Sequence, residues 1–299
     1  MPEIVECVPN FSEGRRPEVV HALRVAIASA PGVRILDVQT DTDHHRSVIT
    51  FVGDRRAIAE GAFAGARKAV ELIDMNAHKG AHPRVGALDV LPFVPIADVT
   101  MDDCVALARS VGKRIAEELG VPVYLYERAA TRPDRRALPD VRRGEYEGLR
   151  TDIERDPDRR PDFGPPRLHA TAGACIVGAR PVLIAWNVNL KSSDVELAKR
   201  IARKIRERDG GLPAVRANGF ALRDRGIVQV SMNMLDYSVT SLTQAFEAIR
   251  VEAAEEGVEV LESEIVGLAP LDAILEGVRS YFRFKDPIRE HILEARLWE

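Results

Sequence analysis

Hydrophobic and polar positions follow the same order of strand and helix patterns in both halves of the chain. Alternating or β-branched apolar runs predict strands, whereas apolar residues spaced three and four apart predict amphipathic helices. In the first half the pattern predicts, in order, a strand at 3–8, a helix at 17–30, strands at 33–40 and 46–54, a helix at 55–73 and a strand at 87–96. A helix at 101–119 and a strand at 121–126 extend this unit. The order β-α-β-β-α-β is that of the ferredoxin-like, or split βαβ, arrangement.

The second half repeats this order without obvious sequence identity to the first. The pattern predicts a strand at 181–190, a helix at 195–208, a hairpin of strands at 214–224 and 226–235, a helix at 241–257 and a strand at 258–267. Ser193 or Asp194 is a suitable N-terminal cap for the first of these helices. The sequence therefore predicts an α+β fold with two ferredoxin-like (βαββαβ) subdomains in tandem, residues 1–178 and 179–299.

Three expectations concern the parts outside this repeat. The predicted strands are apolar enough that the helix-free face of each sheet should be covered by the other subdomain, by residues 127–168 or by a second chain. Residues 127–168 are rich in Arg, Asp and Pro and have weak periodicity, and we expect them to pack in an ordered way at the junction. Residues 285–299 are expected to form a last amphipathic helix.

Composition excludes several classes of protein. The 299 residues are 45% hydrophobic and carry a formal net charge of −4, which is typical of a globular protein without a nucleic-acid partner. Glu3 and Glu6 interrupt the N-terminus, so no signal peptide is expected, and no apolar run is long enough to span a membrane. Three scattered cysteines suit a reducing, cytoplasmic location, and Cys7 and Cys104 are expected to be core thiols.

The stretch "HKGAHPRVG", residues 78–86, is the first candidate site. Gly80 and Pro83 predict a turn instead of a helix, so His78 and His82 need not form the metal pair that helical spacing would give. With no HExxH or CxxC companion, we expect no metal site. Two interpretations stay open on the residues alone. The loop either caps backbone groups, or an imidazole transfers protons beside cations that bind carboxylates, Lys79 and Arg84.

Two further stretches carry candidate residues. "DTDHHRSVITF", residues 41–51, is either a simple hairpin turn or a second imidazole cluster, in which a carboxylate orients a histidine; the candidates are Asp41, Asp43 and His44, with Arg46 as a cation. "DFGPPRLHATAGA", residues 162–174, is either a stiff linker or one wall of a ligand cleft, with donors from Arg167, His169 and Thr171.

Several long blocks closely resemble the glutamate formimidoyltransferase family. They include "ECVPNFSEGR" (6–15), "DHHRSVITFVG" (43–53), "HKGAHPRVGALDVLPFVP" (78–95) and "PDFGPPRLHATAGACIVGARP" (161–181). The resemblance implies two ferredoxin-like subdomains with a folate-binding cleft or tunnel between them, and a homodimer. It implies transfer of the formimidoyl group from N-formimidoyl-L-glutamate to the co-substrate tetrahydrofolate, in the stand-alone form of the family that lacks a cyclodeaminase domain.

The resemblance also assigns residues. It places the catalytic histidine at His82 and the folate-binding stretch at Phe163, Gly164, Pro165, Pro166, Arg167, Leu168, His169, Ala170, Thr171 and Ala172. Arg46, Lys79 and Arg84 are suitable partners for the substrate carboxylates. His45 departs from the family pattern, which usually has Asn there. Two alternatives stay open: formyl transfer between 5-formyltetrahydrofolate and glutamate, or folate binding without catalysis.

Overall fold

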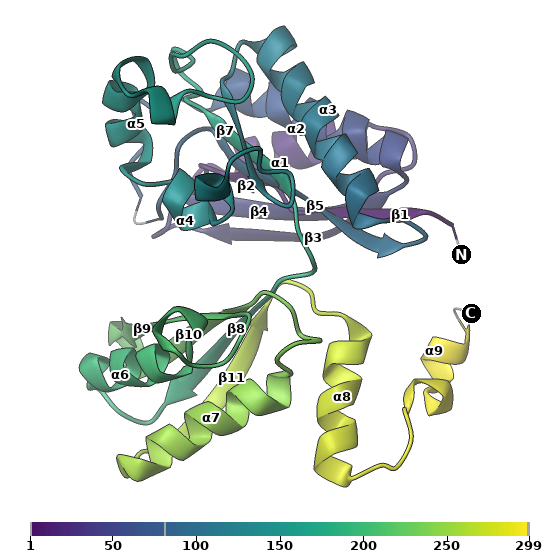
Figure 1. The fold of residues 1–299 in the computed structure, drawn as a ribbon, viewed down its shortest axis with the longest axis vertical. Helices are drawn as coiled ribbons and strands as arrows, with labels where there is room; N and C mark the ends of the chain where they lie inside the picture. The colour runs from purple at the N-terminus through teal and green to yellow at the C-terminus, as the bar shows by residue number, and fades with distance from the viewer. Residues whose placement is uncertain (1, 81, 298–299) are drawn as a thin grey trace. The chain divides into compact units, whose positions relative to one another are not determined.

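The computed structural model describes residues 2–80 and 82–297. They separate into two compact units, unit 1 ending at Arg180 and unit 2 beginning at Pro181 (Figure 1). Each unit contains a β-sheet packed against helices, so the predicted α+β class is confirmed.

Unit 1 begins with the predicted βαββαβ order. Its elements are β1 (Ile4–Cys7), β2 (Asn10–Phe11), α1 (Pro17–Ala28), β3 (Arg34–Asp41), β4 (Arg46–Gly53), α2 (Arg55–Leu72), β5 (Leu88–Ala97), α3 (Met101–Leu119), β6 (Val123–Glu127), α4 (Leu138–Val141), α5 (Glu145–Arg155) and β7 (Cys175–Ala179). Local chemistry fixes several helix ends. Pro17 starts α1, and the capping box of Thr100 and Asp103 starts α3.

The strand order of unit 1 is ferredoxin-like with an extension. The segment β1–β2 lies between β4 and β5 and is antiparallel to both, and β3 pairs with β4 on the outer side. Beyond β5 the sheet continues in parallel through β7 to β6. The predicted extension by α3 and β6 is confirmed, but the pattern analysis assigned no strand to β7, which separates β6 from β5.

Helices cover both faces of this sheet in part. Helices α1, α2 and α3 pack with β1 and β5–β7 into the main core. On the opposite face, Val141 of α4 and Leu149 and Ile153 of α5 pack on Val90 and Tyr124. Residues 127–168 therefore pack in an ordered way within unit 1, where they cover the β5–β7–β6 part of the sheet. Their expected place at the junction of the subdomains stays a prediction.

Unit 2 has the complete ferredoxin-like topology. Its elements are β8 (Ile184–Leu190), α6 (Val195–Ile205), β9 (Val215–Leu222), β10 (Ile227–Met234), α7 (Leu242–Glu255) and β11 (Val260–Val266), with the antiparallel strand order β11-β8-β10-β9. Asp194 caps α6, and Ser241 and Gln244 form the capping box of α7. Helices α6 and α7 pack on the same face of the sheet (Figure 1).

The expectation that the helix-free face is too apolar for water is wrong for unit 2. Trp186 and Val188 belong to the core under the helices, so the alternate residues of β8 face the other way. On that face Asn189 lies opposite Gln229 and Glu262, and its amide accepts from Gln229 at 3.0 Å and donates to Glu262 at 3.0 Å. A face with such a polar network does not require an apolar cover.

The C-terminal segment differs from the predicted single helix. Helix α8 (Leu271–Phe282) is followed by a 3-10 turn at Arg289–His291 and by the short α9 (Leu293–Leu297). Pro287 disfavours helical geometry at the residue before it, and Ile292 is extended, so no helix runs through 285–297. Residues 298–299 lie outside the described part of the chain. Among the described helices, none is both long and apolar enough to cross a membrane.

Candidate active site

His82 lies in the loop that joins α2 to β5. As predicted from Gly80 and Pro83, the described residues of 78–86 are not helical; Ala81 lies outside the described part. Arg46, the first residue of β4, places its Nη1 2.9 Å from Nε2 of His82. A guanidinium can only donate, so Nε2 accepts and the proton of the neutral imidazole is on Nδ1.

The surroundings hold His82 in this neutral form. Burial, followed by the charges of Arg46, Arg142 and His44, lowers the pKa of His82 to about 2, against the opposing charge of Asp41. At neutral pH the imidazole is therefore an acceptor that a nearby cation already occupies. It can serve as a base only after Arg46 has another partner.

A second imidazole is oriented by a carboxylate beside His82. Oδ2 of Asp41 lies 2.8 Å from Nδ1 of His44, and Oδ1 of Asp41 accepts from the amides of Asp43 and His44 at 2.9 and 2.8 Å. Burial raises the pKa of Asp41, but these hydrogen bonds and the charge of His44 lower it overall. The rings of His44 and His82 meet edge to face at 6.3 Å. Asp41 thus orients His44 in this turn, whereas Asp43 contributes its backbone amide.

Some hydrogen-bond donors around His82 lack a charged or fully placed acceptor among the described residues. Arg46 makes no ion pair within 4.0 Å among the described residues, and its other contact is a 3.4 Å bond to Asn10. Nε of Arg142 and the hydroxyl of Ser47 are buried without a partner among these residues, although Arg142 also pairs with Asp89. Unpaired donors and a free cation around one imidazole are the features of an anion-binding site.

A buried carboxylate fixes the hairpin turn behind the cluster. Glu13 accepts from the amides of Arg15 and Arg16 at 2.8 and 2.9 Å and lies 3.1 Å from Nε2 of His45. Burial raises the pKa of Glu13, but these bonds and the charge of Arg16 lower it overall. Nδ1 of His45 lies 3.0 Å from the carbonyl oxygen of Lys79, so His45 links the β2–α1 loop to the loop of His82.

His78 and Arg84 belong to the support of this loop. Arg84 donates from Nε to Nδ1 of His78 at 3.2 Å, and Nε2 of His78 is 3.0 Å from the carbonyl oxygen of His45. The guanidinium of Arg84 is buried and pairs with Glu147 at 2.6 Å and Glu145 at 3.1 Å.

The three cations predicted to bind substrate carboxylates therefore differ in their surroundings. Arg84 is already neutralised by carboxylates of its own chain, which argues against a role in substrate binding. The side chain of Lys79 is exposed, and it is the backbone carbonyl of this residue that contacts His45. Of the three cations, the structure brings Arg46 directly to His82.

Close glycine contacts hold the loop of His82 against the hairpin turn. A Cβ on Gly80 would lie 2.5 Å from the carbonyl oxygen of His44 and 2.7 Å from Cβ of His45. A Cβ on Gly86 would lie 1.9 Å from the carbonyl oxygen of Ala174. Only glycine allows these backbone segments to approach one another so closely.

Gly80→Ala is expected to displace the loop from the turn. We expect a loss of about 1–3 kcal/mol in the free energy of unfolding, measured in urea, together with reduced activity. Gly148→Ala is the matched control, because a Cβ there meets nothing within 4 Å. The interpretation would be wrong if Gly80→Ala were as stable and active as Gly148→Ala.

The predicted folate-binding stretch contacts both ends of the same loop. Before the loop, Met75 donates to the carbonyl oxygen of Thr171 at 2.8 Å. After it, Ala87 donates to the carbonyl oxygen of Ala172 at 2.8 Å. His169 braces the stretch, because its Nδ1 accepts from the amides of Thr171 and Ala172 at 3.3 and 3.0 Å. Arg167 is exposed. The sequence assigned these regions separately, and the structure joins them within unit 1.

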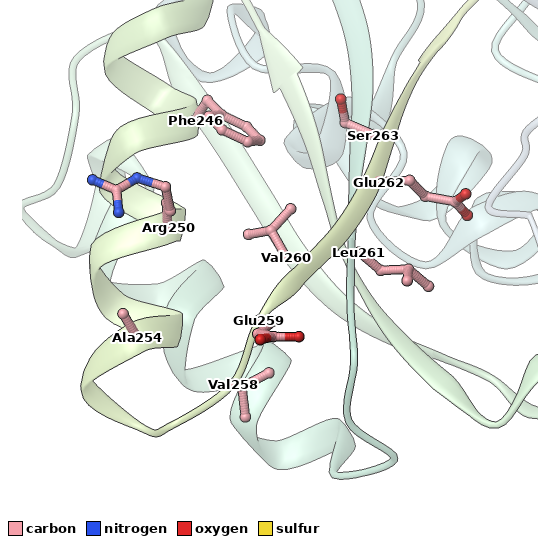
Figure 2. Close-up of a pocket in the computed structure, with 9 residues that line it drawn as sticks. All are labelled: Phe246, Arg250, Ala254, Val258, Glu259, Val260, Leu261, Glu262 and Ser263. Atoms are coloured by element: carbon pink, nitrogen blue, oxygen red, sulfur yellow. The ribbon is translucent and has the colours of Figure 1, made fainter.

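The side chains of the cluster line one small depression, which also includes Phe11 and Ser12. A larger groove of about 520 Å³ lies between α7 and the edge strand β11 in unit 2. Figure 2 shows this groove, with Phe246, Arg250 and Ala254 along α7 and residues 260–263 along β11. Its lining contains no histidine and none of the predicted site residues.

Several members of the cluster were not assigned from the sequence. They are Asn10, Glu13, Ser47, Asp89 and Arg142. The block "ECVPNFSEGR" contains Asn10 and Glu13 and could have indicated them. Nothing in the local pattern singles out Arg142, which comes from the segment 127–168.

Other chemistry has less support in the described residues. No group of three or more His, Cys, Asp or Glu among them could hold a metal ion. Cys7 and Cys104 are fully buried, which confirms that they are core thiols. Burial raises the pKa of Cys104 to about 11, so its sulfur stays protonated at neutral pH.

Comparison with known proteins decides the family. Residues 4–180 match the model of the formiminotransferase domain, N-terminal subdomain, and residues 185–294 match that of the formiminotransferase domain. The chain belongs to the formiminotransferase family. This confirms the resemblance inferred from the sequence.

Relatives of this family member match over nearly its whole length. The glutamate formimidoyltransferase of Thermoplasma acidophilum is 50% identical over 98% of this chain and 97% of its own length. That of Streptococcus pyogenes serotype M1 is 46% identical over 99% of both chains. The formimidoyltransferase-cyclodeaminase of Rattus norvegicus is 47% identical over 94% of this chain, which covers 53% of that longer protein.

Proposed function

We propose that this protein transfers the formimidoyl group from N-formimidoyl-L-glutamate to tetrahydrofolate, giving 5-formimidoyltetrahydrofolate and L-glutamate in histidine degradation. Membership of the formiminotransferase family supports this reaction, as do the names of the two relatives of similar length. The observation that carries the proposal is the contact of His82 with Arg46, because it joins a proton acceptor to a cation that has no carboxylate partner within 4.0 Å among the described residues.

The reaction needs one proton acceptor that later becomes a donor. N5 of tetrahydrofolate attacks the amidine carbon, and the new N5–C bond gives a tetrahedral intermediate. N5 must lose its proton, and the glutamate nitrogen must gain one as its bond to that carbon breaks. His82 performs both steps, first as base and then as acid, and returns to its neutral form.

Arg46 connects substrate binding to the basicity of His82. A carboxylate of formimidoyl-glutamate offers Arg46 a stronger, charge-assisted partner than a neutral imidazole. When the substrate carboxylate binds Arg46, Nε2 of His82 loses its hydrogen-bond partner and becomes free. The carboxylate also neutralises the charge of Arg46, which is one of the charges that lower the pKa of His82. The base therefore becomes active when the anionic substrate is present.

The remaining residues position the reactants. Asp41 holds Nδ1 of His44, which leaves Nε2 of this second imidazole as an additional donor or acceptor at the edge of the His82 ring. Residues 163–172 bind folate, and their bonds to both ends of the loop hold the acceptor close to His82. Such positioning is a major source of rate enhancement when two substrates react.

Three parallel assays test the proposal. The purified protein is given tetrahydrofolate with formimidoyl-glutamate, 5-formyltetrahydrofolate with glutamate, or tetrahydrofolate without a donor. We expect kcat/KM to be at least tenfold higher in the assay with formimidoyl-glutamate than in the assay with 5-formyltetrahydrofolate and glutamate. A tenfold ratio corresponds to roughly 1.4 kcal/mol in activation free energy. Faster formyl transfer would assign that reaction instead, and folate binding without turnover would identify a non-catalytic folate-binding protein.

Assembly and location are further parts of the proposal. The N-terminal subdomain, residues 1–178, and the C-terminal subdomain, residues 179–299, act together in a cytoplasmic homodimer. Light scattering after size-exclusion chromatography should give about twice the 33.0 kDa of one chain. A mass equal to one chain at micromolar concentration would exclude the homodimer.

A further inference from the structure

The turn between α4 and α5 carries side chains to which the proposed reaction assigns no role. This α4–α5 corner, residues 142–147, bends through two residues with positive φ, Gly144 at 80° and Glu145 at 54°. The amide of Glu145 donates to the carbonyl oxygen of Arg142 at 2.7 Å and closes the turn. Positive φ is uncommon outside glycine, so the backbone is bent here in a specific way.

One side chain of the corner reaches the end of the loop of His82. Arg142 binds Asp89, which is 2% exposed, and the other carboxylate oxygen of Asp89 accepts from the amide of Val85 at 2.8 Å. Asp89 also lines the small depression that contains His82. Removal of one partner of such a pair leaves the other buried without its counter-charge, which is costly. Arg142 therefore holds the part of the loop that follows His82.

A second side chain of the corner binds the same loop with the opposite polarity. Glu147 accepts from Nη1 and Nη2 of Arg84 at 2.8 and 2.6 Å, so it holds the guanidinium at two points. Nε of Arg84 in turn donates to Nδ1 of His78, at the start of the loop. The corner thus supplies a cation to Asp89 and a carboxylate to Arg84. A slip between the two segments would bring like charges together, so the opposite polarities fix one register.

Tyr146 joins the corner to the predicted folate-binding stretch. Its hydroxyl donates to Oδ1 of Asn76 at 3.1 Å, and Nδ2 of Asn76 donates to the carbonyl oxygen of Ala170 at 2.8 Å. The ring of Tyr146 is buried in the main core of unit 1, which anchors the corner. Neighbouring residues of α5, Tyr146 and Glu147, therefore reach the two parts of the candidate site, one through Asn76 and one through Arg84.

We propose that Arg142 and Glu147 are positioning residues for the reaction, and that the α4–α5 corner holds the loop of His82 in register with residues 163–172. This rests on the proposed function, in which His82 transfers the protons and residues 163–172 bind folate. Arg142 and Glu147 act through the loop side chains that they bind and not by touching a substrate. Without them the loop shifts, and a misplacement of about 1 Å can cost roughly 100-fold in rate.

Steady-state kinetics of Arg142→Gln test this role. We expect kcat to fall roughly 10- to 100-fold, because the acid–base group is misplaced. KM for formimidoyl-glutamate should change by less than about threefold, because the groups that bind the substrates are retained. Arg142→Lys keeps a cation opposite Asp89 and should recover most of kcat. Glu154→Gln, at an exposed position of α5, is the matched control and should behave as the wild type does.

Glu147→Gln tests the second ion pair. It should lower kcat in the same direction but less, because Glu145 still binds Arg84 at 3.1 Å. The side chain of Glu147 is 65% exposed, so this variant is expected to fold and carries the test alone should Arg142→Gln not fold.

A spectroscopic measurement on the free protein separates positioning from a general loss of stability. With Nε2 of His82 accepting from Arg46, the ring proton is on Nδ1, and ring ¹⁵N chemical shifts at neutral pH identify this tautomer. We expect a mixture of tautomers in folded Arg142→Gln and Glu147→Gln, and the wild-type tautomer in Arg142→Lys and Glu154→Gln.

Two outcomes would overturn the proposal. One is the wild-type tautomer of His82 in both folded glutamine variants of the corner, whatever their turnover, and the other is wild-type kcat in both. Absence of turnover by the wild type would instead contradict the proposed function. The ring signals would still decide whether the corner positions His82, because they do not depend on the reaction.

Discussion

His82→Ala is expected to reduce turnover of formimidoyl-glutamate by roughly two to four powers of ten. A positioned acid–base group contributes about this factor, and here the same imidazole serves two proton transfers. Folate binding should be largely retained, because residues 163–172 are held by backbone bonds and by His169 and not by His82. Steady-state kinetics, combined with equilibrium binding of tetrahydrofolate, separates the two effects.

The matched control is His21→Ala, since His21 is an exposed histidine of α1. Added imidazole should restore part of the activity of His82→Ala and none in the control, because only the former has lost a proton carrier. Near-normal turnover of His82→Ala would exclude His82 as the acid–base group. The carboxylate-oriented His44 would then be the next candidate, testable as His44→Ala.

The parts of the site that follow from local sequence could be predicted. Gly80 and Pro83 exclude a helix for the loop of His82, and "DTDHHR" between two β-branched runs predicts the hairpin turn. The pairing of Asp41 with His44 is also local, because the two residues are three apart and share one turn. Strand and helix order in both units follows from periodicity for the same reason.

Contacts between distant segments could not be predicted in this way. Arg84 was assigned to substrate binding because nothing local shows that Glu147, 63 positions away, neutralises it. Arg142 joins the cluster through Asp89, 53 positions away. Strand β7 is short, contains Gly178 and is buried on both faces, so it lacks the alternation that identifies a strand.

Arg46→Met is expected to lower kcat/KM strongly and also to raise the pKa of His82 in the free protein. Loss of a half-buried, hydrogen-bonded charge partner for the substrate carboxylate should cost about 2–4 kcal/mol, or roughly 30- to 1000-fold in kcat/KM. At the same time the pKa of His82 in the free protein should rise from its low value, because a cation that lowers it is gone. Arg24→Met, at an exposed position of α1, is the matched control and should change neither quantity.

The pH dependence tests whether substrate binding activates His82 through Arg46. Protonated His82 cannot act as a base, so activity falls as the pH decreases through its pKa. In the free protein that pKa is about 2, and it should rise when a substrate carboxylate captures Arg46. The pH profile of kcat reports the pKa of His82 in the enzyme–substrate complex, and the profile of kcat/KM reports it in the free protein. On the acidic side, kcat should therefore begin to fall at a higher pH than kcat/KM does through His82. NMR titration should likewise show the His82 ring titrating at higher pH with bound glutamate than without. Two outcomes would show that Arg46 does not control the basicity of His82: glutamate leaves the titration of the ring unchanged, or Arg46→Met keeps the wild-type pKa of His82. The effect of Arg46→Met on kcat/KM would then come from substrate affinity alone.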